Sequence, residues 1–136
     1  MSIVNISGLD HVALKVRDLK RSIEFYQRVF GFEIKEGECE DNWVIIGVKD
    51  KIYLCLYESR EVDISRNTIY HWGFNIVNAE SLNTLSQELQ KQGVKVDCLD
   101  NGEDGVCDYG VSQSLYVFDP DGYVIELSTV YGGGLG

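Results

Sequence analysis

Two histidines and one glutamate of this chain have the types and the placement of ligands for a divalent metal ion. His11 and His71 are the only histidines in the sequence, and each begins a segment in which apolar and polar residues alternate. Glu126 lies in a similar segment near the C-terminal end. Two imidazoles and a carboxylate bind Mn(II), Ni(II), Fe(II), Co(II) or Zn(II) and leave coordination positions open for a substrate. The set predicts one divalent metal per site without selecting among these ions; the alternative is that each histidine only makes local hydrogen bonds.

Further side chains could line a pocket around such a metal. Cys55 takes the position in the first half of the chain that Glu126 takes in the second, so it is either a fourth ligand or, as we favour, a pocket wall. Glu58 has the opposite strand parity and is interpreted as a solvated strand end. The candidate substrate-binding residues are Tyr53, Cys55, Tyr57, Ser114 and Tyr116. Tyr116 ranks first among the pocket residues and is, with Glu126, a candidate catalytic residue.

An internal repeat is expected to position these residues. Residues 9–32 and 69–94 both read as a strand that opens with histidine, then a helix, then a glycine. In each opening strand the apolar residues take one face and the histidine takes the other. Three short strand-like segments follow each helix, at residues 32–35, 43–48 and 52–58 in the first half and 94–99, 115–118 and 123–129 in the second. Each half is therefore predicted to be a βαβββ unit.

The predicted fold class is α+β. Two βαβββ modules, at about residues 7–60 and about residues 67–130, are expected to form a curved, mixed eight-stranded sheet with a metal-binding cleft. Residues 1–136 are predicted to be a single domain, because a chain of this length buries a sufficient core without further staples.

Local signals predict where these elements begin and end. Asp18 and Asn78 are expected to cap the two helices at their N-terminal ends. Asp-Pro-Asp-Gly at residues 119–122 predicts a turn, since proline suits its second position and glycine tolerates a positive φ. The acidic, glycine-rich segment 100–110 is interpreted as solvated surface, with a lid over the cleft as the alternative.

Composition excludes several functional classes. The formal net charge of -10, from 12 Lys and Arg against 22 Asp and Glu, argues against nucleic acid as a partner. The N-terminus lacks the pattern of a signal peptide and no apolar run is long enough to span a membrane, so a cytoplasmic location is predicted. The four cysteines show no CxxC spacing and are interpreted as thiols.

Two motifs resemble the vicinal oxygen chelate superfamily, which includes glyoxalase I, fosfomycin-resistance thiol transferases, extradiol dioxygenases and bleomycin-resistance binding proteins. Residues 9–26, together with Val29-Phe-Gly-Phe32, are similar to its opening strand and helix. Asp119-Pro-Asp-Gly-Tyr-Val-Ile-Glu-Leu127 is similar to its closing hairpin, whose glutamate is a metal ligand. The resemblance implies His11, His71 and Glu126 as metal ligands, a small-molecule substrate and a homodimer.

Within that superfamily, Tyr53-Leu-Cys-Leu56 and Ser114-Leu-Tyr116 look most like the fosfomycin-resistance branch. This likeness implies a pocket lined by Tyr53, Cys55, Ser114 and Tyr116, and it suggests a thiol co-substrate. The chain departs from the branch at Ala13, where the branch has a threonine, and in having no Lys or Arg after Lys95. Because the branch holds a phosphonate with such side chains, fosfomycin itself is a doubtful substrate.

The other enzymatic branches fit less well. Glyoxalase I has a glutamate ligand at the position of Cys55, and extradiol dioxygenases add a further histidine that this chain lacks. The sequence therefore predicts a divalent-metal-dependent enzyme of lyase or transferase type, which chelates a small oxygenated substrate and activates it by Lewis-acid catalysis. The alternative is a metal-independent protein that sequesters a small molecule, as in drug resistance.

Overall fold

In the computed structural model the chain divides into two compact units, Met1–Val62 and Asp63–Gly136. The structure describes residues 3–66, 69, 71–76, 81–97, 106–108 and 112–130. The boundary falls in the interval between the two predicted modules. That the two units form one domain stays a prediction.

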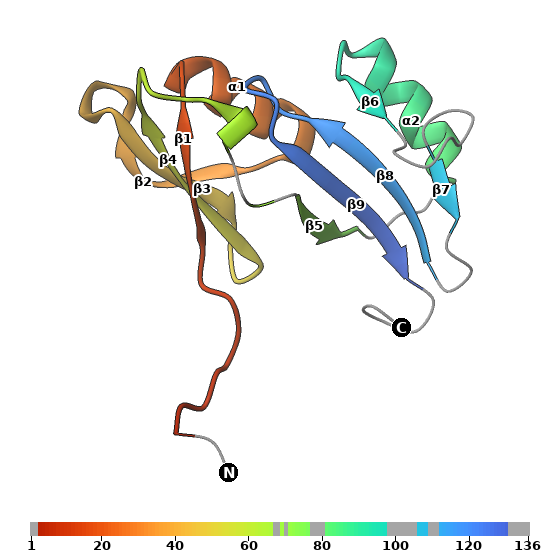
Figure 1. The fold of residues 1–136 in the computed structure, drawn as a ribbon, viewed down its shortest axis with the longest axis horizontal. Coiled ribbons are helices and arrows are strands. Elements are labelled where there is room, and N and C mark those ends of the chain that lie inside the picture. Colours follow the sequence, from red (N-terminus) through yellow and green to blue (C-terminus); the bar gives the residue numbers. More distant parts are fainter. Residues whose placement is uncertain are drawn as a thin grey trace. The chain divides into compact units, whose positions relative to one another are not determined.

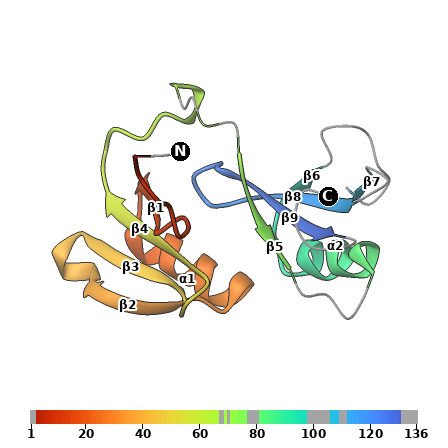
Figure 2. The same ribbon diagram turned by 90° about the horizontal axis from the view of Figure 1, so that it is seen from below.

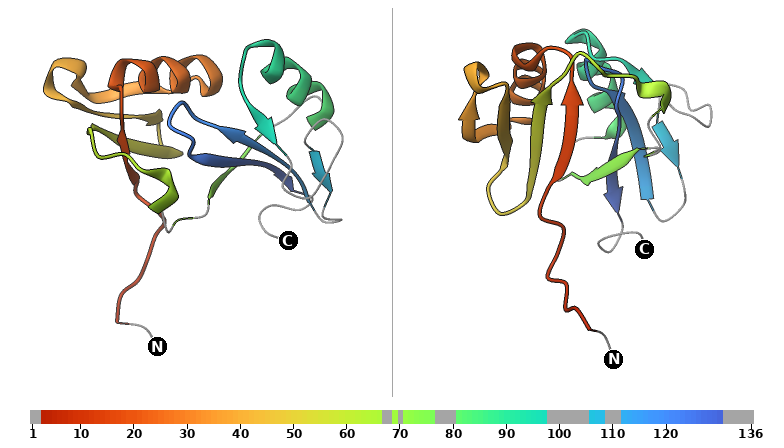
Figure 3. Two further views of the ribbon diagram at one scale, coloured as in Figure 1. Left: turned by 45° about the horizontal axis from the view of Figure 1, so that its top comes forward. Right: turned by 60° about the vertical axis from the view of Figure 1, so that its left-hand side comes forward.

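The first unit is a four-stranded sheet with one long helix (Figure 1). Its elements are β1 (Val12–Val16), α1 (Leu19–Phe30), β2 (Glu33–Glu38), the short 3-10 helix η1 (Cys39–Asp41), β3 (Trp43–Val48) and β4 (Ile52–Glu58). The strand order is β1-β4-β3-β2. β1 runs parallel to β4, as the two arrows in Figure 3 show, and the other pairs are antiparallel.

Helix α1 covers one face of this sheet because its apolar residues recur with the helical period. Leu19, Ile23 and Tyr26 are all buried. The fully buried residues of the sheet that share this core include Val16, Val44, Ile46, Leu54 and Leu56. The opposite face carries the alternate residues, among them those of the candidate site.

Side chains satisfy the backbone at the start of α1. The carboxylate of Asp18 accepts a hydrogen bond from the Arg21 amide at 3.1 Å, which confirms Asp18 as the N-cap. Glu58 is exposed, as expected for a strand end, but its Oε2 also accepts from the Leu19 amide at 2.9 Å. A residue interpreted only as solvated thus ties the end of β4 to the start of α1.

The second unit repeats this plan with one additional strand. Its elements are η2 (Ile64–Arg66), β5 (Trp72–Asn75), α2 (Leu82–Lys91), β6 (Val96–Asp97), β7 (Val106–Asp108), β8 (Ser112–Phe118) and β9 (Val124–Val130). The strand order is β5-β9-β8-β6, and β7 also pairs with β8. β5 runs parallel to β9, as β1 does to β4. The α+β class and the two βαβββ units are therefore confirmed.

Helix α2 begins later than the sequence suggested. Its N-cap is Ser81, whose hydroxyl accepts from the Thr84 amide at 3.2 Å. Asn78, the residue predicted to cap it, lies outside the described residues. Leu82 and Leu89 of this helix are buried. The helix itself packs beside β8 (Figure 2).

Strand β7 lies within segment 100–110, for which the sequence predicted no strand. Val106–Asp108 pairs antiparallel with β8, with Val106 opposite Leu115. The pairing occurs because β6 covers only the C-terminal half of β8 and leaves the backbone groups of the other half available. The rest of that segment lies outside the described residues.

The turn between β8 and β9 is held by one buried carboxylate. Oδ1 of Asp119 accepts from the amides of Asp121 and Tyr123, both at 2.9 Å. Gly122 has a φ of 96° and donates its amide to the Asp119 carbonyl at 3.0 Å. The predicted turn is confirmed, and it fixes the register in which β9 returns along β8.

We predict that Asp119→Ala lowers the free energy of unfolding by about 1.5–3 kcal/mol, because two buried amides lose a charged acceptor. Asp119→Asn is the matched control, since it keeps the Oδ1 acceptor and should lose less. Urea denaturation of the three proteins measures the difference. Equal stability of Asp119→Ala and the unchanged chain would contradict this account of the turn.

Candidate metal centre

Strand register brings the candidate residues of the second unit onto one face of its sheet. Glu126 is opposite Gly73 in the parallel pair β5–β9 and opposite Tyr116 in the antiparallel pair β8–β9. Side chains opposite each other across a pair of strands point to the same face. His71 precedes Gly73 by two residues and shares this face, as the alternation in the sequence predicted.

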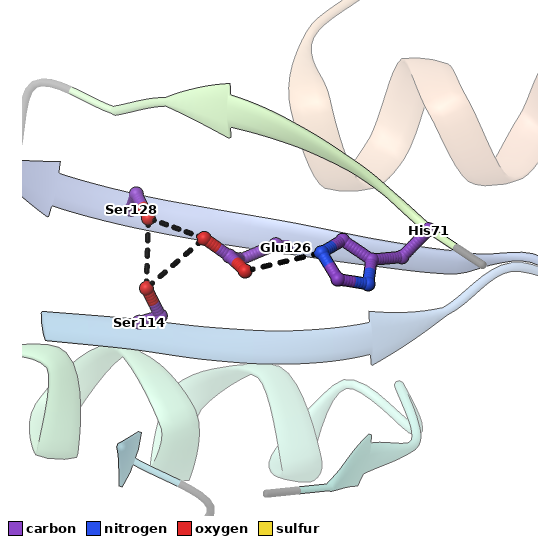
Figure 4. A network of polar contacts seen from close by, with 4 residues as sticks. All are labelled: His71, Ser114, Glu126 and Ser128. Carbon is purple, nitrogen blue, oxygen red and sulfur yellow. Dashed lines mark hydrogen bonds and ion pairs between the residues drawn. The ribbon is translucent and has the colours of Figure 1, made fainter. Parts of the chain in front are cut away.

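The distance between His71 and Glu126 fits a shared metal ion. Nε2 of His71 lies 3.4 Å from Oε1 of Glu126 (Figure 4). A charge-assisted N–H to carboxylate hydrogen bond is usually shorter, at about 2.7–2.9 Å. Metal bonds of about 2.0–2.2 Å place two ligand atoms roughly 3.0 Å apart at a right angle and roughly 3.4 Å apart at the tetrahedral angle. The two side chains therefore fit adjacent coordination positions of one ion.

Hydroxyl groups keep the Glu126 carboxylate in place and ionised. Burial raises the pKa of Glu126, but hydrogen bonds from Ser128, Tyr116 and Ser114, together with the nearby His71, lower it more. The net result is a pKa below the usual carboxyl value. The side chain is 17% exposed, so the site offers a shielded anion, which is the state that a metal ligand requires.

Tyr116 contacts both candidate ligands. Its ring meets the His71 ring edge-on, with the centroids 5.4 Å apart, and its hydroxyl hydrogen-bonds with Glu126. It is buried and packs against Val124. The structure thus places this candidate catalytic residue against both candidate ligands.

A hydrogen bond of His11 in the first unit determines which of its two ring nitrogens a metal would use. Its Nδ1 lies 2.7 Å from Oδ2 of Asp10. A carboxylate oxygen only accepts hydrogen bonds, so Nδ1 is the donor to Asp10 and Nε2 is the nitrogen that a metal would use. A histidine that donates its second nitrogen to a carboxylate is the usual arrangement of a metal-ligating histidine.

Cys55 takes the place in the first unit that Glu126 takes in the second. It lies opposite Ala13 in the parallel pair β1–β4, just as Glu126 lies opposite Gly73. Burial raises the pKa of the Cys55 thiol, and the carboxylates of Asp10 and Glu36 raise it further. The side chain therefore stays protonated at neutral pH, which favours a pocket wall over a metal ligand.

Tyr53 and Tyr57 share the face of Cys55 on β4 but differ in their surroundings. The Lys35 ammonium lies 4.4 Å from the centroid of the Tyr53 ring, a cation–π contact. Tyr57 is 47% exposed. The face that β4 presents on the side of Cys55 thus combines a protonated thiol, an aromatic ring that carries a cation and an exposed tyrosine.

The structure assembles part of the predicted site within one unit. His71, Ser114, Tyr116 and Glu126 come together in the second unit, while His11, Tyr53, Cys55 and Tyr57 belong to the first. Within either unit, the described residues include no group of three His, Cys, Asp or Glu side chains that could hold a metal. The three-ligand set, which draws on both units, is accordingly a proposal.

Sequence reasoning missed two residues that contact the candidate ligands. Ser128 donates to Glu126 Oε2 at 2.7 Å, and Asp10 pairs with His11. The available signal for Ser128 was its spacing, since a residue two positions after Glu126 in a strand must share its face. No corresponding signal identified Asp10, because adjacent residues of a strand normally point apart.

Comparison with known proteins identifies the family. The model of the Glyoxalase/Bleomycin resistance protein/Dioxygenase superfamily matches residues 8–127. The chain belongs to this superfamily. No helix in the described part of the chain has the length and apolar character needed to span a membrane.

Individual relatives include fosfomycin-resistance proteins. The chain is 31% identical over 128 residues to the metallothiol transferase FosB of Staphylococcus saprophyticus, covering 91% of this chain and 78% of the relative. It is 27% identical over 130 residues to the glutathione transferase FosA of Serratia marcescens, covering 90% and 80%.

A solved structure with the same fold is that of a mutant of the fosfomycin resistance protein FosX from Listeria monocytogenes. The TM-score is 0.71 at 23% identity, with 94% of each chain covered. That structure is a complex with Mn(II) and 1S,2S-dihydroxypropylphosphonic acid.

We predict that Cys55 in the metal-free protein reacts with iodoacetamide several-fold more slowly at pH 8 than Cys39, because burial and neighbouring carboxylates keep its thiol protonated. Two variants that each retain only one cysteine, Cys55 or the partly exposed Cys39, make the comparison. The rate for Cys55 should continue to rise with pH above the ordinary thiol range, because the pKa of this thiol is raised. A Cys55 that reacts as fast as Cys39 would instead indicate an activated thiolate.

Proposed function

We propose that this protein is a divalent-metal-dependent enzyme of lyase or transferase type that acts on a small oxygenated substrate. The observation that carries the proposal is the pairing of His71 Nε2 with Glu126 Oε1 at the separation of two metal ligands. His11 is the proposed third ligand, because it holds in the first unit the position that His71 holds in the second. Superfamily membership and the manganese in the FosX complex support the same reading.

The proposed metal supplies a Lewis acid that polarises substrate oxygens and stabilises negative charge during the reaction. The residues of the chain have separate tasks around it. The two histidines contribute neutral nitrogen ligands, and Glu126 contributes one negative charge, so the proposed site keeps a net positive charge. That net charge suits a substrate with adjacent oxygen atoms.

The presence of a thiol at the position of Cys55 limits the types of reaction that the proposed site favours. A protonated thiol is a weak base, so it does not accept a proton as a carboxylate at this position would. A reaction that shuttles a proton between neighbouring carbons is therefore disfavoured. Addition of water or of a thiol co-substrate to the substrate needs no base at Cys55 and fits the site better, and the names of the FosA and FosB relatives agree with transfer of a thiol.

The remaining predicted pocket residues are proposed to shape the substrate site. Tyr53, with Lys35 against its ring, and the exposed Tyr57 offer aromatic and cationic contacts from the first unit. Tyr116 acts from the second unit through its contacts with both ligands. A homodimer and a cytoplasmic location stay predictions.

A metal-independent binding protein is the second candidate. The observation that favours it is the acidic surroundings of Cys55, where Asp10 and Glu36 lie close enough to affect the thiol. Carboxylates and tyrosines together suit a flat, cationic ligand. Ligand binding that persists in EDTA would favour this function over the metal-dependent one.

We predict one bound divalent metal per chain in protein purified without chelator, measured by elemental analysis. Added Mn(II), Co(II), Ni(II) or Zn(II) should raise the thermal unfolding midpoint of metal-free protein, because a ligand that binds only the folded state stabilises it. His11→Ala, His71→Ala and Glu126→Gln should each weaken metal binding by more than about a hundredfold, beyond the 10–100-fold cost typical of losing a supporting residue.

The control for these variants is Glu88→Gln, which neutralises an exposed glutamate of α2 and should bind metal normally. Protein that purifies without metal, together with an unfolding midpoint that does not respond to any of the four ions, would refute the proposed function.

A further inference from the structure

The side-chain hydroxyls of two serines form a closed triangle with one oxygen of Glu126 (Figure 4). Ser128 Oγ lies 2.7 Å from Glu126 Oε2, and Ser114 Oγ lies 3.1 Å from the same oxygen. The two serine oxygens are 2.7 Å apart. Both serines are buried, and the other carboxylate oxygen, Oε1, is the one that faces His71.

Counting protons shows how the triangle is arranged. Each serine hydroxyl has one proton to donate, so two protons serve three contacts. A hydroxyl that donates to a carboxylate usually lies about 2.5–2.7 Å from it. Ser128 meets that distance and Ser114 does not. The arrangement that uses both short contacts is a relay in which Ser114 donates to Ser128 and Ser128 donates to Glu126.

The relay restrains the Glu126 carboxylate, which would otherwise rotate about its terminal torsion. The terminal torsion of a glutamate side chain is broad, and a free carboxylate can bind a metal through one oxygen or two. A short bond to Oε2 from a buried strand residue holds the carboxylate plane and turns Oε1 toward His71. In that orientation the carboxylate would bind a metal through one oxygen and occupy one coordination position.

We propose that Ser128 is a positioning residue that commits Glu126 to one-oxygen metal binding, and that Ser114 acts through Ser128. This inference rests on the proposed function, because it concerns the same metal. It also gives Ser114 a task inside the sheet in addition to its predicted place in the substrate pocket. The positioning roles of Ser128 and Ser114 cannot be predicted from their residue types alone.

The test compares Ser128→Ala, Ser114→Ala and Ser128→Thr. Ser128→Thr keeps the hydroxyl and suits a strand. The matched control is Ser86→Ala, which removes a fully buried serine hydroxyl from α2 in the same unit. Titration of metal-free protein with Co(II) gives the affinity, and the visible absorption of Co(II) reports its coordination number.

We predict that Ser128→Ala weakens Co(II) binding about tenfold or more, within the usual range for supporting residues of a metal site. Its Co(II) absorption should also become weaker, because a carboxylate free to bind through two oxygens raises the coordination number. Ser114→Ala should have a smaller effect, while Ser128→Thr and Ser86→Ala should stay within about threefold of the unchanged chain.

Thermal unfolding of the metal-free variants separates positioning from folding. Ser128→Ala should lose affinity out of proportion to any loss of stability, as judged against Ser86→Ala. Affinity and spectrum that are unchanged in Ser128→Ala, or a loss that Ser128→Thr does not restore, would overturn this inference and leave the proposed function intact. An unchanged chain that binds no Co(II) would instead refute the proposed function itself.

Discussion

A carboxylate shielded from water is stable as an anion only where donors or cations surround it, and the site of the second unit is built on that constraint. The hydroxyls of Ser114, Tyr116 and Ser128 surround the Glu126 carboxylate on the same sheet face, and the histidine ring lies at its other oxygen. Every one of these groups is placed by the pairing of β5, β9 and β8. A shift of one residue in either pairing would turn the donors to the core face and leave the carboxylate without them.

The repeated unit explains both the likeness and the asymmetry of the two halves. In each half, a histidine precedes a short strand that runs parallel to the last strand of its unit. One residue of that last strand lies opposite the second residue of the short strand. The second unit has Glu126 there and the first has Cys55. Each copy of the scaffold thus offers one histidine as a proposed ligand, but only the second offers a carboxylate, and the protonated thiol of the first adds no base.

Membership in the Glyoxalase/Bleomycin resistance protein/Dioxygenase superfamily limits the types of reaction to be expected. It does not specify one reaction among them. The proposed metal ligands are two histidines and a carboxylate. The other candidate site residues would then decide the substrate and the reaction. Here those residues include a thiol where a second carboxylate could stand, a lysine against Tyr53 and a serine pair behind the glutamate.

The sequence was sufficient to establish the repeat, the α+β class, the Asp119 turn and, within each unit, the sheet face that carries Cys55 or that carries His71 and Glu126. These follow from local geometry, since successive residues of a strand alternate between faces and a helix repeats every 3.6 residues. Partners across the sheet could not be read in the same way. The bond from Ser128 to Glu126, its link to Ser114, the Glu58 contact with α1 and the pairing of β7 all depend on which residues meet after folding. Register is a non-local property, set by core packing and turns together, so these contacts emerged only when the strands were placed side by side.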